Sequence, residues 1–180
     1  QSELFVYYSG HGAPGLNDGQ GYLLPVDANP TTVELNGYPL ETLYRNLQKI
    51  PAKSLTVVID ACFSGSSQAG ILVKNASSVA LKRVATTTPL SEATVLTAAG
   101  TSEVASWDKE ARLGLFTRYF LEALTGKADG EGFGNGDGTV TLGEVRNYLE
   151  SEVPYMARRL YNRAQHPQVS GRDEKVMATN

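Results

Sequence analysis

Short continuous runs of apolar and β-branched residues recur along the chain. The runs at residues 4–8, 55–59 and 93–99 predict three strands, and the first two are expected to be buried. A shorter apolar run at residues 22–26 predicts a hairpin-like piece. These runs supply the strands of the expected sheet.

Apolar residues recur at helical spacing between and after these runs. The pattern predicts a helix over residues 39–50, with its apolar side chains on one face. A second helix is expected over residues 116–124, ended by Gly126, and a third from residue 142 to about residue 153. Strands that alternate with helices favour an α/β layered fold with a mostly parallel sheet.

Segments of weak periodicity lie between the predicted elements. Residues 66–92 are rich in Ser, Thr and Ala and predict a long mobile loop. Loops of this length inside a compact domain are usually functional or disordered. Residues 130–138 are rich in glycine, and the tail after residue 167 is expected to be polar, without a further element.

Length, charge and cysteine content narrow the class of protein. The 180 residues suit one compact domain, and the net charge of -3 provides no broad basic surface for nucleic acid. No apolar run approaches the roughly 20 residues of a membrane helix, and no signal segment is recognised, so no membrane contact is expected. The single cysteine cannot form an internal disulfide, and we expect a cytoplasmic protein.

One histidine and the single cysteine directly follow predicted strands. His11 comes after the strand at residues 4–8, and Cys62 after the strand at residues 55–59. Ligands of parallel α/β sheets bind beyond the carboxyl ends of the strands, where both side chains are expected. A lone cysteine is often a small buried hydrophobe. Next to a histidine that removes its proton, however, a thiol becomes a nucleophile.

Acyl transfer by a thiolate also requires N–H donors for the oxyanion that forms on attack. Gly12 follows His11, and a glycine lets the backbone approach a substrate closely. The N–H groups of Gly12 and Cys62 are therefore the candidates for an oxyanion hole.

Two motifs around these residues resemble those of a known family. The sequences YSGHG at residues 8–12 and DACFSG at residues 60–65 are similar to the histidine and cysteine motifs of caspase-like peptidases, most closely metacaspases and bacterial orthocaspases. The separation of about 50 residues matches the spacing in caspases. The resemblance continues through residues 114–117, 137–141 and 165–167 and covers nearly the whole chain.

The resemblance implies a three-layer sandwich with a mostly parallel caspase–haemoglobinase sheet and helices on both faces. Residues 1–180 would supply this domain from its third strand onward. The chain opens two residues before a predicted strand, which suggests a fragment or a processed subunit. An N-terminal fragment or a partner chain is therefore an expected partner that would complete the sheet.

The resemblance also implies a substrate preference. Ser9 and Asp60 match the positions that line an acidic S1 pocket in metacaspases, so protein or peptide substrates are expected to be cut after Arg or Lys. The alternative role for Asp60 is a structural hydrogen bond to the turn. Trp107 either walls the substrate cleft or packs elsewhere, and His166 is expected to be a surface residue without a chemical role.

A calcium site is weakly suggested at residues 129–153. Asn135, Asp137 and Glu144 occupy ligand positions of an EF-hand-like loop, but Phe133 stands where the first ligand belongs. The alternative is a glycine-rich turn before a helix. No cofactor is therefore expected to be required.

The long predicted loop carries a possible processing site. Lys82 and Arg83 lie among small residues, so an enzyme that cuts after basic residues is expected to cleave itself there. The alternative is that these charges only solvate the loop. The leading hypothesis is thus a self-processing cysteine endopeptidase, and the alternatives are a caspase-like peptidase with another P1 preference or a noncatalytic interaction module.

Overall fold

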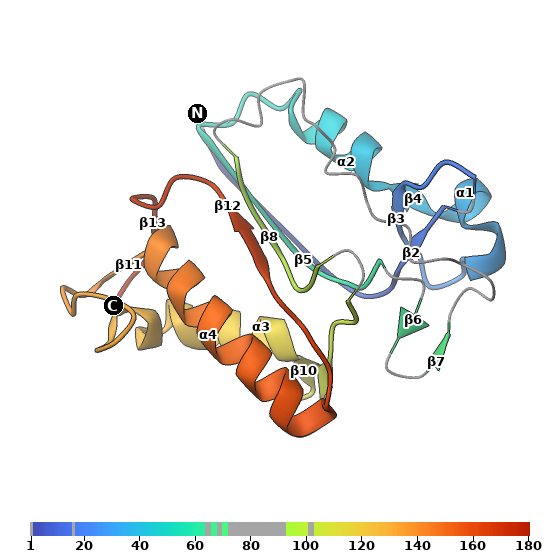
Figure 1. Ribbon diagram of the computed structural model, residues 1–180. Coiled ribbons are helices and arrows are strands. Elements are labelled where there is room, and N and C mark those ends of the chain that lie inside the picture. Colours follow the sequence, from blue (N-terminus) through green and yellow to red (C-terminus); the bar gives the residue numbers. More distant parts are fainter. Residues whose placement is uncertain (1, 16, 64–65, 68–69, 72–92, 101–102) are drawn as a thin grey trace.

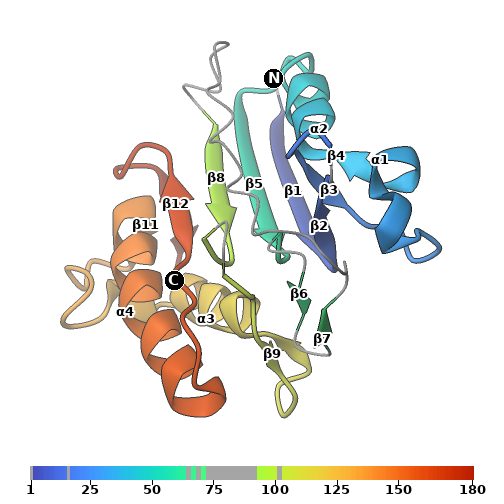
Figure 2. The same ribbon diagram turned by 45° about the vertical axis from the view of Figure 1, so that its right-hand side comes forward.

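The computed structural model describes residues 2–15, 17–63, 66–67, 70–71, 93–100 and 103–180 (Figures 1 and 2). A four-stranded sheet in the order β1-β5-β8-β12 forms its centre. β1, β5 and β8 are parallel, and β12 runs antiparallel to β8. The strands span Glu3–Ser9 (β1), Ser54–Asp60 (β5), Thr94–Thr97 (β8) and Gln168–Ser170 (β12).

Helices cover both faces of this sheet. Figure 1 shows α2 (Leu40–Leu47) on one side of the strands and α3 (Leu115–Leu124) and α4 (Leu142–Tyr161) on the other. Alternate residues of β5 enter the two cores, because successive strand side chains point to opposite faces. Val57 packs in the core on the α2 side, and Val58 packs in the core with α3 and α4. The predicted three-layer α/β fold with a mostly parallel sheet is confirmed.

The predicted burial of the first strand is wrong, although the strand itself is present. Exposure alternates along β1, and Phe5 and Tyr7 are 56% and 45% exposed. β1 lies at an edge of the sheet, and in the described part of the chain α3 and α4 cover β5 and β8 rather than Phe5. The continuous apolar run at residues 4–8 therefore did not indicate a strand that is buried on both of its faces.

A small antiparallel sheet follows β1. β3 (Gly21–Leu23) pairs with β2 (Gly12–Pro14) and with β4 (Tyr38–Pro39), in the region where the sequence predicts a hairpin-like piece. Further short elements are η1 (Pro30–Thr32), α1 (Val33–Asn36), β9 (Trp107–Asp108), β10 (Leu113–Gly114) and η2 (Lys127–Asp129). β6 (Ser66–Ser67) and β7 (Gly70–Ile71) pair within the segment predicted as a loop, and residues 72–92 lie outside the described residues.

The last helix is longer than its sequence predicts. The predicted end lies near residue 153, directly before Pro154, which lacks the N–H that an interior helical position uses. α4 nevertheless continues to Tyr161 with Pro154 inside it. Val153 and Ala157, on either side of the proline, are both fully buried. Tertiary packing of this face outweighs the local cost of the proline.

The tail also contains strands that the sequence analysis did not expect. β12 extends the central sheet, and β13 (Val176–Thr179) pairs with β11 (Thr139–Thr141). The exposed and intermediate residues of these short strands hide their pairing in a polar sequence. α3 ends before Gly126 as predicted, with Gly126 at a φ of 101°. Of the helices in the described residues, none is long and apolar enough to cross a membrane.

Candidate active site

The parallel pairing of β1 and β5 brings the two predicted catalytic residues to one edge of the sheet. Ser9 lies opposite Asp60 at the last register position, and the Gly10 N–H donates to the Asp60 carbonyl over 3.1 Å. The chain continues from these strand ends to His11 and to Cys62. Both residues line one cavity of about 280 Å³, together with Ser9, Asp60 and the segment 105–107.

The Cys62 thiol is held by a backbone segment on the far side of this cavity. The Ala105 N–H donates to Sγ over 2.9 Å. The thiol in turn donates to the Ala105 carbonyl oxygen, which lies 3.6 Å from Sγ. Burial raises the pKa of the Cys62 thiol to about 11, against the lowering effect of the Ala105 N–H. Asp60 raises this pKa further and Arg163 lowers it. At neutral pH the thiol is therefore protonated, and catalysis requires a base.

His11 lines the same cavity. Its residue is exposed, and within the described residues no hydrogen bond joins its side chain to Cys62. Contacts between a base and its nucleophile are often long in a substrate-free enzyme and tighten when substrate binds. The Cys62 thiol and the His11 imidazole thus share one cavity. In the structure the thiol forms its hydrogen bonds with Ala105 and not with His11.

Gly12 packs directly against the turn that carries Cys62. A Cβ at Gly12 would lie 2.6 Å from the Cys62 carbonyl oxygen, so a larger residue would push the two segments apart. The Leu24 N–H donates to the His11 carbonyl, and hydrogen-bonded pairs alternate along antiparallel strands. The Gly12 N–H therefore points away from β3. The oxyanion-hole assignment to Gly12 and Cys62 stays a prediction.

Asp60 lines the cavity, and its side chain also forms structural hydrogen bonds to α3. The side chain is buried, and its Oδ2 accepts the Thr117 N–H at 3.2 Å and the Thr117 hydroxyl at 2.5 Å. Thr117 belongs to the first turn of α3, whose N-cap residue, Gly114, has no side chain to offer. Burial raises the pKa of the Asp60 carboxyl, and the two bonds from Thr117 oppose this effect.

Gly114 makes this arrangement possible. A Cβ at Gly114 would overlap the Asp60 carboxylate. The segment at residues 114–117 was noted in the sequence as part of the family resemblance, but its contact with Asp60 could not be read from the spacing. Ser9, the other predicted S1 residue, is exposed and lines the same cavity. Trp107 also lines it, and its residue is 45% exposed.

The calcium candidates take part in hydrogen bonds within their own loop. Asn135 N–H donates to Glu144 Oε1 at 3.2 Å, and Asn135 Nδ2 donates to Asp137. Glu144 also forms a capping box with Thr141 at the start of α4. Buried Asp129 accepts three backbone N–H groups, from residues 136, 137 and 138. Among the described residues, no group of three or more His, Cys, Asp or Glu side chains is arranged to hold a metal.

Sequence reasoning missed Gln165, the neighbour of His166. Gln165 is fully buried, accepts the Ser106 N–H at 2.8 Å and donates to the Ala98 carbonyl at 3.0 Å. His166 is exposed, as predicted, and its Nδ1 lies 2.5 Å from Glu103. A glutamine in a polar tail gives no sign of burial until its partners are known. Lys82 and Arg83, the predicted processing residues, lie outside the described residues.

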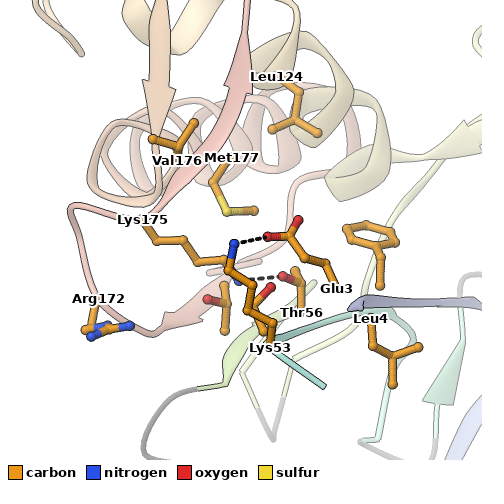
Figure 3. Close-up of a pocket in the computed structure, with 12 residues that line it drawn as sticks. Glu3, Leu4, Lys53, Thr56, Leu124, Arg172, Lys175, Val176 and Met177 are labelled. Carbon is orange, nitrogen blue, oxygen red and sulfur yellow. Dashed lines mark hydrogen bonds and ion pairs between the residues drawn. The ribbon is translucent and has the colours of Figure 1, made fainter. Parts of the chain in front are cut away.

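A second cavity, of about 390 Å³, lies at the opposite end of the strands (Figure 3). Lys53 pairs with Glu3 at 3.9 Å, and Lys175 donates to the Thr56 hydroxyl at 2.7 Å. Burial lowers the pKa of Lys175, and Arg172 lowers it further. Neither His11 nor Cys62 lies here, so the larger cavity is separate from the candidate active site.

The fold and the site together define an α/β protein with a thiol and an imidazole at the carboxyl edge of a parallel sheet. The family model of the caspase domain matches residues 2–176. The chain therefore belongs to the caspase-domain family of cysteine peptidases. None of the curated proteins matches it.

We predict that Gly114→Ala displaces the Asp60 carboxylate and lowers the free energy of unfolding by about 1–3 kcal/mol, because the added methyl group has no room. Urea denaturation measures the change. Gly100→Ala is the matched control. Its Cβ would meet only the carboxylate end of Glu103, at 3.3 Å, so its stability should stay within about 0.5 kcal/mol of the unmodified protein. Equal effects of the two substitutions would contradict the packing argument.

Proposed function

We propose that the chain is a cysteine endopeptidase in which Cys62 is the nucleophile and His11 the general base, acting after Arg or Lys. The observation that carries this proposal is the shared cavity of His11, Cys62 and Asp60 at the carboxyl ends of β1 and β5. Its metacaspase or bacterial orthocaspase type is proposed from the motifs at residues 8–12 and 60–65.

In the proposed reaction, His11 removes the thiol proton and the Cys62 sulfur attacks the carbonyl carbon of the scissile peptide. The oxyanion that forms accepts hydrogen bonds from the N–H groups of Gly12 and Cys62. Protonated His11 then gives its proton to the leaving amine, and an acyl-enzyme remains. Water activated by His11 hydrolyses this thioester and restores the thiol. Each group in this scheme comes from the chain, so we propose that no cofactor, calcium included, is required.

The high pKa of Cys62 determines what substrate binding must accomplish. A thiol with a pKa of about 11 is almost entirely protonated near neutral pH. His11 must therefore reach Sγ, and the thiol must turn from the Ala105 carbonyl. This same observation favours the second candidate function, a noncatalytic caspase-like interaction module.

The proposed P1 preference rests on Asp60. Thr117 occupies its Oδ2, and Oδ1 accepts no hydrogen bond from the described residues. A carboxylate with a spare oxygen at a cavity wall can pair with a P1 guanidinium or ammonium group. The exposed Ser9 hydroxyl would add an acceptor at the rim. A caspase-like peptidase with a different P1 preference is the alternative that a peptide panel separates.

The edge of β1 that pairs with no described strand is a candidate binding site for a further strand. β1 has seven residues and pairs with β5 alone among the described strands, and an open strand edge is a template for another strand. Phe5 and Tyr7 are exposed on one face of this strand. We therefore propose that an N-terminal fragment or a partner chain adds to the sheet there.

Replacing the nucleophile or the base tests the mechanism. Cys62→Ala should abolish cleavage of peptide substrates, and His11→Ala should lower kcat/KM by at least about 100-fold. The double variant should be little worse than Cys62→Ala, because the two groups act as one unit. Appreciable turnover in Cys62→Ala would rule out the mechanism. A wild-type protein that cleaves no peptide but binds caspase-like partners would favour the interaction module.

Asp60→Asn tests the P1 preference with the least disturbance of the fold. The amide oxygen can still accept the two hydrogen bonds from Thr117, whereas Asp60→Ala removes them and leaves the first turn of α3 without this acceptor. We expect kcat/KM on an Arg or Lys substrate to fall by about 10- to 100-fold, because the charge-assisted bond is lost. The melting temperature should change little. An Asp60→Asn enzyme with full activity on Arg substrates would exclude Asp60 from P1 recognition.

Self-processing is the corresponding regulatory proposal. An enzyme that accepts P1 Lys or Arg should cut its own chain after Lys82 or Arg83. Mass spectrometry of the active enzyme and of Cys62→Ala checks this, and the nick is expected in the active protein alone. Two products that stay together during gel filtration are expected, since β5 and β8 pair in one sheet on either side of the cut. The same nick in Cys62→Ala would point to another protease.

A further inference from the structure

The Gln165 side chain joins two segments that are distant from it in the sequence. It is fully buried and is satisfied at both ends, by the Ser106 N–H over 2.8 Å and by the Ala98 carbonyl over 3.0 Å. Ala98 comes just after β8, and its own N–H donates to the Ile59 carbonyl of β5. Gln165 therefore ties Ser106 to the central sheet.

The peptide group that Gln165 holds is the one that faces the thiol. The Ser106 N–H and the Ala105 carbonyl belong to one planar peptide unit and point in opposite directions. Gln165 accepts from the N–H on one side, and the Cys62 Sγ lies 3.6 Å from the carbonyl oxygen on the other. The preceding Ala105 N–H donates to Sγ over 2.9 Å. The Ala105 N–H belongs to the preceding peptide unit, so the position of Ala105, next to the anchored Ser106 N–H, determines how both of its backbone groups meet the sulfur.

A second contact supports the same segment. The His166 N–H donates to Glu103 at 2.6 Å, and the Gly100 N–H donates to the same carboxylate oxygen at 3.1 Å. Residues 165 and 166 therefore hold the segment 103–106 at two points. Of the two, only Gln165 is buried and bonds to the peptide group beside the thiol.

We propose that Gln165 is a positioning residue for Cys62, which anchors the backbone at Ser106 and so keeps the adjacent Ala105 where its N–H reaches the sulfur. This inference rests on the proposed role of Cys62 as the nucleophile. The N–H bond stabilises the thiolate over the thiol. Without Gln165, the buried Ser106 N–H would lack an acceptor, and the segment that contains Ala105 would shift to satisfy it.

The electrostatic setting of the thiol makes this bond important. Asp60 opposes thiolate formation, Arg163 favours it, and His11 lines the same cavity. Burial is the largest effect and favours the neutral thiol. The Ala105 N–H is the only hydrogen-bond donor to Sγ among the described residues. Its displacement leaves burial unopposed by any hydrogen bond, so the thiolate should become rarer at each pH.

The test compares Gln165→Met with Gln168→Met. Methionine has nearly the shape of glutamine but lacks both hydrogen-bonding groups. Gln168 is exposed in β12 and donates only to the carbonyls of residues 166 and 167, which makes it a matched control. The rate of alkylation of Cys62 by iodoacetamide is measured from pH 6 to pH 11, with circular dichroism to confirm folding.

We expect Gln165→Met to slow alkylation about tenfold at each pH from about 7 to 9, which corresponds to an upward displacement of the profile by about one pH unit, since reactivity follows the thiolate fraction. Gln168→Met should retain the wild-type profile. An unchanged or downward-shifted profile in folded Gln165→Met overturns the proposal. Alkylation measures the state of the Cys62 thiol whether or not the protein cleaves peptides. A wild-type protein whose thiol is alkylated but that cleaves no peptide would therefore overturn the proposed function and leave the positioning role of Gln165 standing.

Two measurements on the wild-type protein decide the case if Gln165→Met does not fold. The Ser106 amide hydrogen should exchange slowly with solvent, as a buried donor to Gln165 does. The amide chemical shift of Ala105 should titrate with the midpoint of the alkylation profile. Rapid exchange at Ser106, or an Ala105 amide that does not follow the thiol titration, overturns the proposal.

Discussion

The in-register parallel pairing of β1 with β5 is the constraint on which the site depends. It aligns Ser9 with Asp60, and a slip by one residue would reverse the faces of all β1 side chains. The hydrogen bond from Gly10 to the Asp60 carbonyl extends the pairing one residue past β1, to the residue before His11 and to the end of β5, two residues before Cys62. The two chemical groups come together because the strands that carry them end at the same level.

Around this edge, side chains from the opposite half of the molecule complete the cavity. Asp60 reaches the first turn of α3 through Thr117, and the Thr117 hydroxyl lies 2.8 Å from the Tyr7 hydroxyl on β1. The segment after β8 closes the far side and is held there by Gln165. The candidate site is therefore assembled from β1, β5, α3 and the tail, and each contributes contacts that the others require.

The sequence predicted the parts of this site that follow strand ends, and it failed where contacts are distant. His11, Cys62 and the parallel sheet could be predicted because apolar runs locate strand ends and parallel strands share a carboxyl edge. The prediction of α4 ended too early, because burial of Val153 and Ala157 continues the helix through Pro154. Gln165 carried no local signal, since its burial is created by partners that lie 59 and 67 residues away.

The two structural features of Asp60, its position in the cavity wall and its contact with α3, have an evolutionary consequence. One carboxylate both faces the cavity and supports the start of α3, so a mutation that reverses the charge of the pocket also removes a helix contact. Descendants of such a chain would rarely replace this carboxylate in a single step. Selection would find easier routes through exposed residues that line the cavity, such as Ser9 and Trp107. The fold thereby channels divergence toward the exposed lining of the cavity and preserves the carboxylate that α3 requires.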